Sequence, residues 1–134
     1  MSRSGYSEDI DDDWGFIRWR GRVASAARGR RGQQFLRDLV AALDAMPEKR
    51  LITGEIQNDS GVCAIGSVGL RRGIDLAAID PENWEAVGQI FDIAEPLVRE
   101  VFYLNDEAFG GKTPEQLWQR MRDWAVALIK PVPL

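Results

Sequence analysis

The chain of 134 residues contains no histidine and only one cysteine, Cys63. Without histidine it cannot use a Ser-His-Asp or Cys-His catalytic arrangement, histidine metal ligands or a histidine pH switch. One cysteine cannot form an internal disulfide, which favours a reducing, cytosol-like compartment. Because Cys63 lies in the apolar run from Val62 to Ile65, we expect a small buried hydrophobe and not a reactive thiol.

Signals for secretion and for membrane insertion are also missing. The first twenty residues carry five carboxylates, where a signal peptide has a basic start and an apolar stretch. No window approaches the roughly 20 apolar residues of a membrane span. With 45% apolar residues and a net charge of −4, the composition is typical of a soluble globular chain.

The composition divides the chain into two parts. Residues 1–13 are polar and acidic and have little to bury, so we expect a flexible acidic N-terminal arm. Residues 14–134 contain the apolar periodicity and are predicted to form a single helical domain. A chain of this length buries roughly two-thirds of its unfolded surface, which is enough for a core without disulfides or a structural metal.

Hydrophobic spacing predicts a mainly α fold, a compact bundle of five or six short amphipathic helices. The first covers Phe16 to Ala27, and a turn at residues 29–32 separates it from a second that ends at Pro47. Four later helices are expected, over residues 62–70, 80–92, 92–104 and 113–128. We expect Asp80 with Pro81, Asp92 with Glu95, and Thr113 with Gln116 to begin the last three.

Residues 50–65 leave two alternatives open. Residues 50–56 form either a short strand or an irregular connector, because their alternation is incomplete. We favour a helix over residues 62–70 that ends at Gly73, and a hairpin of residues 51–56 and 62–68 is the rival. Gly66 and Gly69 cost a helix about 1 kcal/mol each, so we expect them where a neighbour packs closely.

Five segments stand out in combination. They are residues 14–22 (WGFIRWRGR), 25–35 (SAARGRRGQQF), 41–50 (AALDAMPEKR), 62–66 (VCAIG) with 72–75, and 103–107 (YLNDE) before a Trp-rich terminal helix. Together they resemble a group of small hypothetical proteins encoded by tailed bacteriophages and prophages, over nearly the whole chain from Trp14. The resemblance implies a viral gene product in a bacterial host cytoplasm, and it assigns no catalytic residue.

The strongest charge pattern is a run of arginines without any acidic residue between Gly15 and Arg37. It consists of Arg18, Arg20, Arg22, Arg28, Arg30, Arg31 and Arg37. Arginine forks suit phosphate or carboxylate, and Trp14 or Trp19 could stack on a base if exposed. A solvated face paired with carboxylates, a protein or other anionic partner, and nucleic acid are the three alternatives. The net charge of −4 and a pI near 4.9 argue against dominant phosphate binding.

A second candidate is the polar run Asn105, Asp106 and Glu107, beside Gly110 and Gly111. These oxygens could hold a divalent cation or act as acid and base in a hydrolase, although the run lacks calcium-loop spacing. We favour a structural role in capping or in hydrogen bonds to a neighbouring loop or arginine. A site shared with Arg71, Arg72 or Asp75 is the alternative.

The acidic residues 8–13 form a third candidate, since they could imitate nucleic-acid phosphates, although a solvated arm is favoured. No catalytic residue, metal ligand or cofactor is predicted, because phosphate loops, nucleophile elbows and zinc spacings are absent. The sequence therefore favours a non-enzymatic accessory protein that binds a host or phage protein, with inhibition of a bacterial defence system as the specific version. Nucleic-acid binding through residues 18–37 and a metal-dependent hydrolase are the alternatives, and the partner and the oligomeric state stay open.

Overall fold

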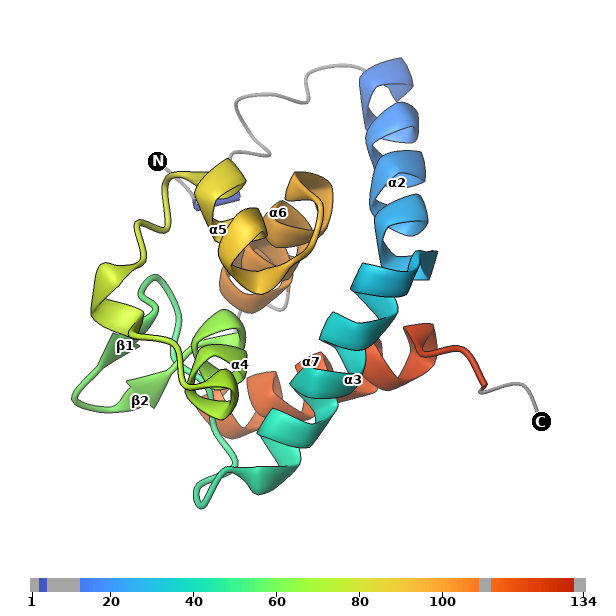
Figure 1. Cartoon of the computed structure of the whole chain (residues 1–134). Coiled ribbons are helices and arrows are strands. Elements are labelled where there is room, and N and C mark those ends of the chain that lie inside the picture. Colours follow the sequence, from blue (N-terminus) through green and yellow to red (C-terminus); the bar gives the residue numbers. More distant parts are fainter. Residues whose placement is uncertain (1–2, 5–12, 109–111, 132–134) are drawn as a thin grey trace.

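The computed structural model describes residues 3–4, 13–108 and 112–131. Within these ranges the chain is mainly helical, with one two-stranded antiparallel sheet (Figure 1). The predicted helical bundle with a small hairpin near residues 50–65 is therefore confirmed. The elements are α2 (Asp13–Arg28), α3 (Arg30–Ala45), β1 (Gln57–Asn58), β2 (Gly61–Val62), α4 (Ala64–Arg72), the 3-10 turn η1 (Leu76–Ala78), α5 (Trp84–Phe91), α6 (Glu95–Tyr103), the π-helical turn η2 (Leu104–Ala108) and α7 (Pro114–Leu128).

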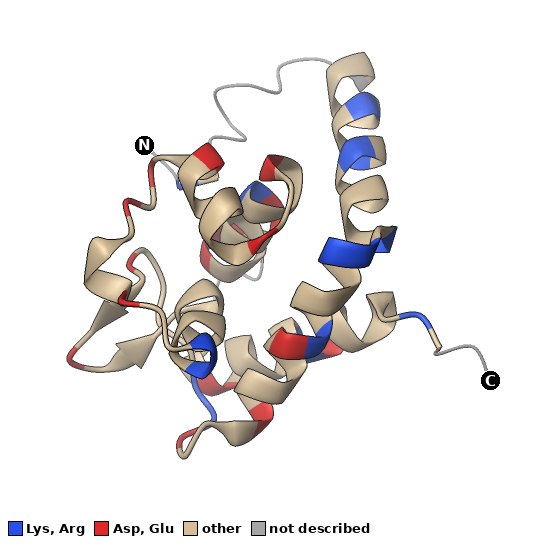
Figure 2. Cartoon of the chain, viewed as in Figure 1, with Lys and Arg blue, Asp and Glu red and all other residues tan. Residues whose placement is uncertain are grey.

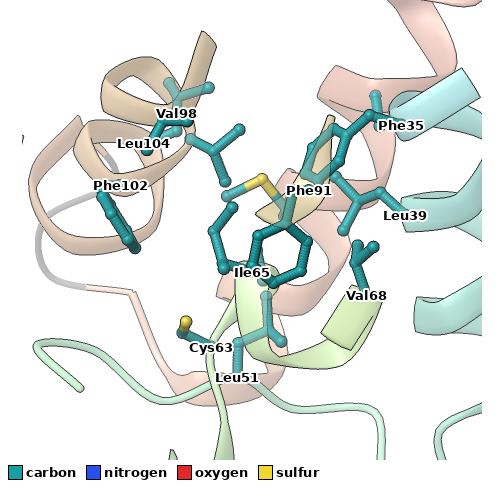
Figure 3. Packing of buried hydrophobic residues seen from close by; sticks show 14 of the residues in the cluster. Phe35, Leu39, Leu51, Cys63, Ile65, Val68, Phe91, Val98, Phe102 and Leu104 are labelled. Atoms are coloured by element: carbon teal, nitrogen blue, oxygen red, sulfur yellow. The ribbon is translucent and has the colours of Figure 1, made fainter. Parts of the chain in front are cut away.

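Helix α3 lies at the centre of the core. Its apolar face packs against both α4 and α7, and Phe35, Leu36, Leu39 and Leu43 on this face are completely buried. The Phe35 ring meets the ring of Phe91 from α5 edge to face, with 6.4 Å between the ring centroids (Figure 3). The second predicted helix is thus the one around which the others are arranged.

The junction between α2 and α3 is shorter than predicted. We expected a turn over residues 29–32, but α3 already begins at Arg30, so the helical ladder is interrupted only at Gly29. Gly32 lies inside α3, where a Cβ atom would be 1.9 Å from the carbonyl oxygen of Ala26. Gly32 is therefore needed for the close crossing of α2 and α3. It does not mark a turn, as the sequence had suggested.

The hairpin in the structure is shorter than the hairpin that the sequence allowed as an alternative. Among the residues that the structure describes, only Gln57–Asn58 and Gly61–Val62 pair as strands, so a hairpin of residues 51–56 and 62–68 is wrong. Residues 51–56 form an irregular connector, the second of the two alternatives. Two backbone hydrogen bonds hold this connector beside β2, from the Ile52 N–H to the Val62 carbonyl and from the Cys63 N–H to the Ile56 carbonyl.

Helix α4 confirms the predicted helix over residues 62–70 that ends at Gly73. It ends at Gly73, whose φ of 72° is the left-handed conformation that glycine favours. A Cβ atom at Gly66 would lie 2.5 Å from the Ile56 carbonyl oxygen, and one at Gly69 would lie 2.5 Å from Leu76. Both glycines therefore sit at close contacts, as expected. Cys63 is buried, as predicted, and its Sγ atom also caps α4 by accepting the Gly66 N–H at 3.5 Å.

Two of the predicted helix starts are displaced along the chain. Asp80 accepts the Glu82 N–H in a local turn, whereas Asn83 caps α5 by accepting the Ala86 N–H at 3.1 Å. Asp92 has a φ of 56° and ends α5, and α6 starts after Ala94 without a side-chain cap, so the capping box at Asp92 is wrong. The capping box of Thr113 and Gln116 at the start of α7 is confirmed.

Candidate functional site

Helix α2 is attached to the rest of the molecule by a narrow apolar seam. Trp19, Val23 and Ala27 recur every four residues on the inner face and are buried. Trp19 and Val23 pack with Tyr103 in a small cluster beside the main core, against which Tyr103 also packs. The first turns of α2 stand clear of the other helices in Figure 1.

The opposite side of α2 exposes large apolar residues. The Trp14 side chain is 73% exposed and the Ile17 side chain 59%, and one helical turn places both on the same side. Arg18 and Gly21 are exposed on this side as well, and a Cβ atom at Gly21 would touch nothing. We call Trp14, Ile17, Arg18 and Gly21 the outer face of α2. Phe16 lies nearer the body and is 49% exposed.

The predicted arginine run divides into two groups. Arg20 forms an ion pair with the buried carboxylate of Glu100 at 2.6 Å, and Arg37 donates a hydrogen bond to the Lys130 carbonyl oxygen. The other arginines of the run, Arg18, Arg22, Arg28, Arg30 and Arg31, are exposed, and the paired Arg20 is 44% exposed as well. Figure 2 shows that the coloured residues along α2 and at its junction with α3 are basic, whereas acidic residues occur on α5, on α6, near the hairpin and on the later part of α3.

The exposed arginines have few partners among the described residues. Arg31 reaches Asp92 at 3.3 Å, and both side chains are more than half exposed. The Arg22 guanidinium lies 5.3 Å from the centre of the Trp19 ring. Arg18 and Arg30 form no ion pair with a residue that the structure describes, so their charges remain available to a partner.

Asn105 has a structural role at the end of α6. Its side chain is 2% exposed, its amide oxygen accepts the Ala64 N–H at 3.0 Å, and its amide nitrogen donates to the Ile52 carbonyl oxygen at 2.8 Å. The π-helical turn η2 directs this side chain inward, where it joins the start of α4 to the irregular connector.

Asp106 and Glu107 bind a segment from the other end of the chain. Both guanidinium edge nitrogens of Arg3, Nε and Nη2, donate to the two oxygens of Asp106 at 2.6 Å, and the hydroxyl of Ser4 donates to Glu107 at 2.6 Å. Arg3 is 9% exposed and Ser4 is 1% exposed. These two residues belong to the predicted arm, and their docking against α6 and η2 is not indicated by the sequence.

Four further side chains belong to this site. The Phe102 ring centre lies 4.4 Å from the Arg3 guanidinium carbon, and the Trp84 indole N–H donates to the Arg3 carbonyl. Arg99 donates to the Ser4 carbonyl at 2.6 Å, and the Arg3 Nη1 donates to the Cys63 Sγ at 3.8 Å. The residues that bind Arg3 and Ser4, called the Arg3 site from here on, are Cys63, Trp84, Arg99, Phe102, Asp106 and Glu107.

The Arg3 site holds the pKa of the Asp106 carboxyl below its ordinary value. Burial alone would raise this pKa, but the hydrogen bonds and the positive charge of Arg3 outweigh it, with help from the Gly54 N–H and the Asn105 amide. Asp106 is therefore an ionised partner of a guanidinium. This arrangement matches the predicted hydrogen bonding to an arginine, although the arginine is Arg3.

The other residues of the polar alternative lie in different surroundings. Arg72 donates to Asp38 at 2.7 Å and to the Phe91 carbonyl at 2.7 Å, which joins α4 to α3 and α5. Asp75 caps η1 by accepting the Ala77 N–H, and Arg71 is exposed beside a surface hollow. None of these contacts involves residues 105–107. Gly110, Gly111 and residues 8–12 of the acidic arm lie outside the described residues.

Arg99, Trp84 and Arg3 are the parts of the site that sequence reasoning missed. The Arg99 guanidinium lies 4.1 Å from the centre of the Trp84 ring and 4.7 Å from that of Trp19, so it sits against both aromatic rings. The available signal was the charged pair Arg99 and Glu100 within an otherwise apolar helix. Both side chains are buried.

Comparison with known proteins does not extend these observations. No family model, no curated protein and no solved structure matches this chain. In the part of the chain that the structure describes, no group of three or more acidic or cysteine side chains could hold a metal ion. None of the described helices is both long enough and apolar enough to cross a membrane. The resemblance to phage-encoded proteins stays a prediction.

Proposed function

We propose that this chain is a protein-binding module that places the outer face of α2 in an apolar groove on an acidic partner protein. The observation that carries this proposal is the exposure of Trp14 and Ile17, at 73% and 59%, on one side of a helix that is anchored by its other side. Amphipathic helices bind grooves through anchors spaced three or four residues apart, which is the spacing of these two side chains.

The residue types support a binding role. Tryptophan and arginine are enriched among the residues that dominate binding energy at interfaces, and Trp14 has Arg18 one turn further along the same helix. Gly21 has no side chain on the outer face, so a partner could approach the helix backbone there. Covering Trp14 and Ile17 would remove apolar surface from water, which is the main favourable term in association.

The charge of this region supports an acidic partner. No carboxylate lies between Gly15 and Arg37, and Arg18 and Arg22 are exposed on α2. Complementary charge steers association and fixes the orientation of the docked helix. A protein is favoured over nucleic acid because the exposed anchors are largely apolar and the chain has a net charge of −4.

The resemblance to phage proteins supports a host or phage protein as this partner. On that basis we further propose that the chain is an accessory protein, and more specifically that it inhibits a bacterial defence system. An inhibitor of this kind needs a binding surface and no catalytic group, which agrees with the use of Asp106 as an ion-pair partner of Arg3.

The proposal is tested with the full chain immobilised as bait in a bacterial lysate. The bait is compared with Trp14→Ser/Ile17→Ser and with the control Val126→Ser, which changes a 46% exposed apolar residue on α7. The retained protein is identified, purified and titrated against each variant. We expect an acidic partner whose affinity falls at least about tenfold in the double variant, as for loss of an interface anchor, and is unchanged in the control.

Two further measurements distinguish the mode of binding. A synthetic peptide of residues 13–28 is expected to compete with the full chain for the partner, and raised salt is expected to weaken binding. Equal retention by the double variant and the control contradicts the proposal, as does the absence of any partner at low salt. A gel shift with DNA or RNA that is lost in Arg18→Ala/Arg22→Ala, without a protein partner, would favour nucleic-acid binding instead.

A further inference from the structure

The Arg3 site recognises both side chains and both backbone carbonyls of a two-residue segment. Asp106 binds the guanidinium of Arg3, and Glu107 binds the hydroxyl of Ser4. The Trp84 indole N–H and the Arg99 guanidinium bind the two carbonyl oxygens. The bound segment belongs to no helix or strand, and these contacts come from α5, α6 and η2. The geometry is that of a peptide in a binding site.

The binding groups are held in place by contacts that do not involve Arg3 or Ser4. One oxygen of Asp106 also accepts the Gly54 N–H at 3.0 Å and the Asn105 amide at 2.9 Å. The Arg99 guanidinium lies against the rings of Trp19 and Trp84. Because these supports come from the body of the protein, we expect Asp106 and Arg99 to keep their positions when the segment leaves. A preformed site loses little conformational entropy on binding.

The geometry of the site suits arginine better than lysine. Two parallel hydrogen bonds of 2.6 Å to one carboxylate require the planar guanidinium, which an ammonium group cannot reproduce. The Phe102 ring, 4.4 Å from the guanidinium carbon, adds a stacking surface. Only 12% of the Asp106 side chain is exposed, so a carboxylate without a cation there would be costly.

We infer that the Arg3 site is a receptor for an arginine–serine segment of a partner protein, and that the chain's own Arg3 and Ser4 are its resident occupant. A partner segment binds by displacing this occupant. Tethering gives the resident segment an effective concentration on the order of millimolar, so it competes with any segment that arrives from solution. This site is separate from the outer face of α2, and its binding does not depend on the function proposed above.

The inference is tested with a full-length chain whose own segment is weakened by Arg3→Ala/Ser4→Ala. The probe is the peptide acetyl-Ser-Arg-Ser-Gly-amide, titrated by calorimetry. We expect saturable binding and a rise in Tm, because a ligand that binds only the folded state stabilises it. The wild-type chain should bind the same peptide at least about tenfold more weakly, because its tethered segment competes.

Two controls separate a receptor from a purely structural contact. The peptide with lysine in place of arginine should bind the weakened chain at least about tenfold more weakly, since it lacks the guanidinium fork. Adding Asp106→Asn to the weakened chain should remove the preference between the two peptides. Absence of binding to the folded, weakened chain at millimolar peptide overturns the inference. Equal affinity for the arginine and lysine peptides, or equal affinity of the wild-type and weakened chains, overturns it as well.

Discussion

Helices α2 and α3 follow one another, each has 16 residues, and they are separated by Gly29 alone. They differ in what they bury. Helix α3 completely buries Phe35 and Leu39 within the core, whereas α2 buries a seam around Trp19 and exposes Trp14. An apolar stripe on a helix therefore does not by itself specify what the helix packs against. In α3 the apolar stripe forms the core. In α2 the buried seam accounts for only some of the apolar residues, and the others are exposed to solvent.

The largest contrast is expected from truncating one apolar residue in each helix. Leu39→Ala should reduce the free energy of unfolding by about 2–5 kcal/mol, because it leaves a cavity at a fully buried position. Ile17→Ala should change it by less than about 0.5 kcal/mol, because its side chain is 59% exposed. Urea unfolding followed by circular dichroism measures both values. Similar losses in the two variants would mean that the outer face of α2 is packed against the body.

The two helices also differ at their internal glycines. Gly32→Ala in α3 places a Cβ atom 1.9 Å from the Ala26 carbonyl oxygen, so the helices must move apart at a cost of about 1–3 kcal/mol. Gly21→Ala in α2 meets open space and should gain up to about 1 kcal/mol from helix propensity. Thermal unfolding should therefore shift in opposite directions. A stabilised Gly32→Ala variant would contradict the close crossing of α2 and α3.

The smallest effect concerns an ion pair at the end of α3. Arg122 on α7 lowers the pKa of Asp44, chiefly through its hydrogen bond and also through its charge, although burial opposes the shift. The pKa of Asp44 should rise in Arg122→Ala and stay unchanged in the α2 control Arg22→Ala, as measured by NMR titration. Because the folded-state pKa is the lower one, the pair stabilises the fold above the unfolded-state pKa of about 3.9. The stability difference from Arg122→Ala should disappear as the pH falls through the folded-state pKa of Asp44. A difference that persists at low pH would show that another interaction was removed.

Some features that depend on residues close in the sequence were predictable, although the capping box expected at Asp92 was not found. The Thr113 capping box and the left-handed end of α4 at Gly73 depend on short spacings, and both were found. The glycine at position 32 was misread because its reason is a contact with another helix. Asp80 has the residue type of a helix cap, but it accepts the Glu82 N–H, and Asn83, three residues later, caps α5.

The candidate site was predictable only in part, for the same reason. Asp106 and Glu107 were singled out by their chemistry, and an arginine was an expected partner. That this partner is Arg3 could not be read from the sequence, because 103 positions separate the two residues. Arg18 and Arg20 look alike in the sequence, but only Arg20 reaches a buried carboxylate, Glu100. Their difference depends on where α6 lies against α2.

The small cluster of Trp19, Val23 and Tyr103, which lies beside the main core, has a consequence for local opening. Apart from this cluster and the ion pair of Arg20 with Glu100, little holds the first turns of α2, so we expect them to open more readily than α3, α4 and α7. Backbone amides around Trp19 should therefore exchange with deuterium much faster than those around Leu39. A segment that opens in this way can change its conformation on a binding partner while the other helices stay folded.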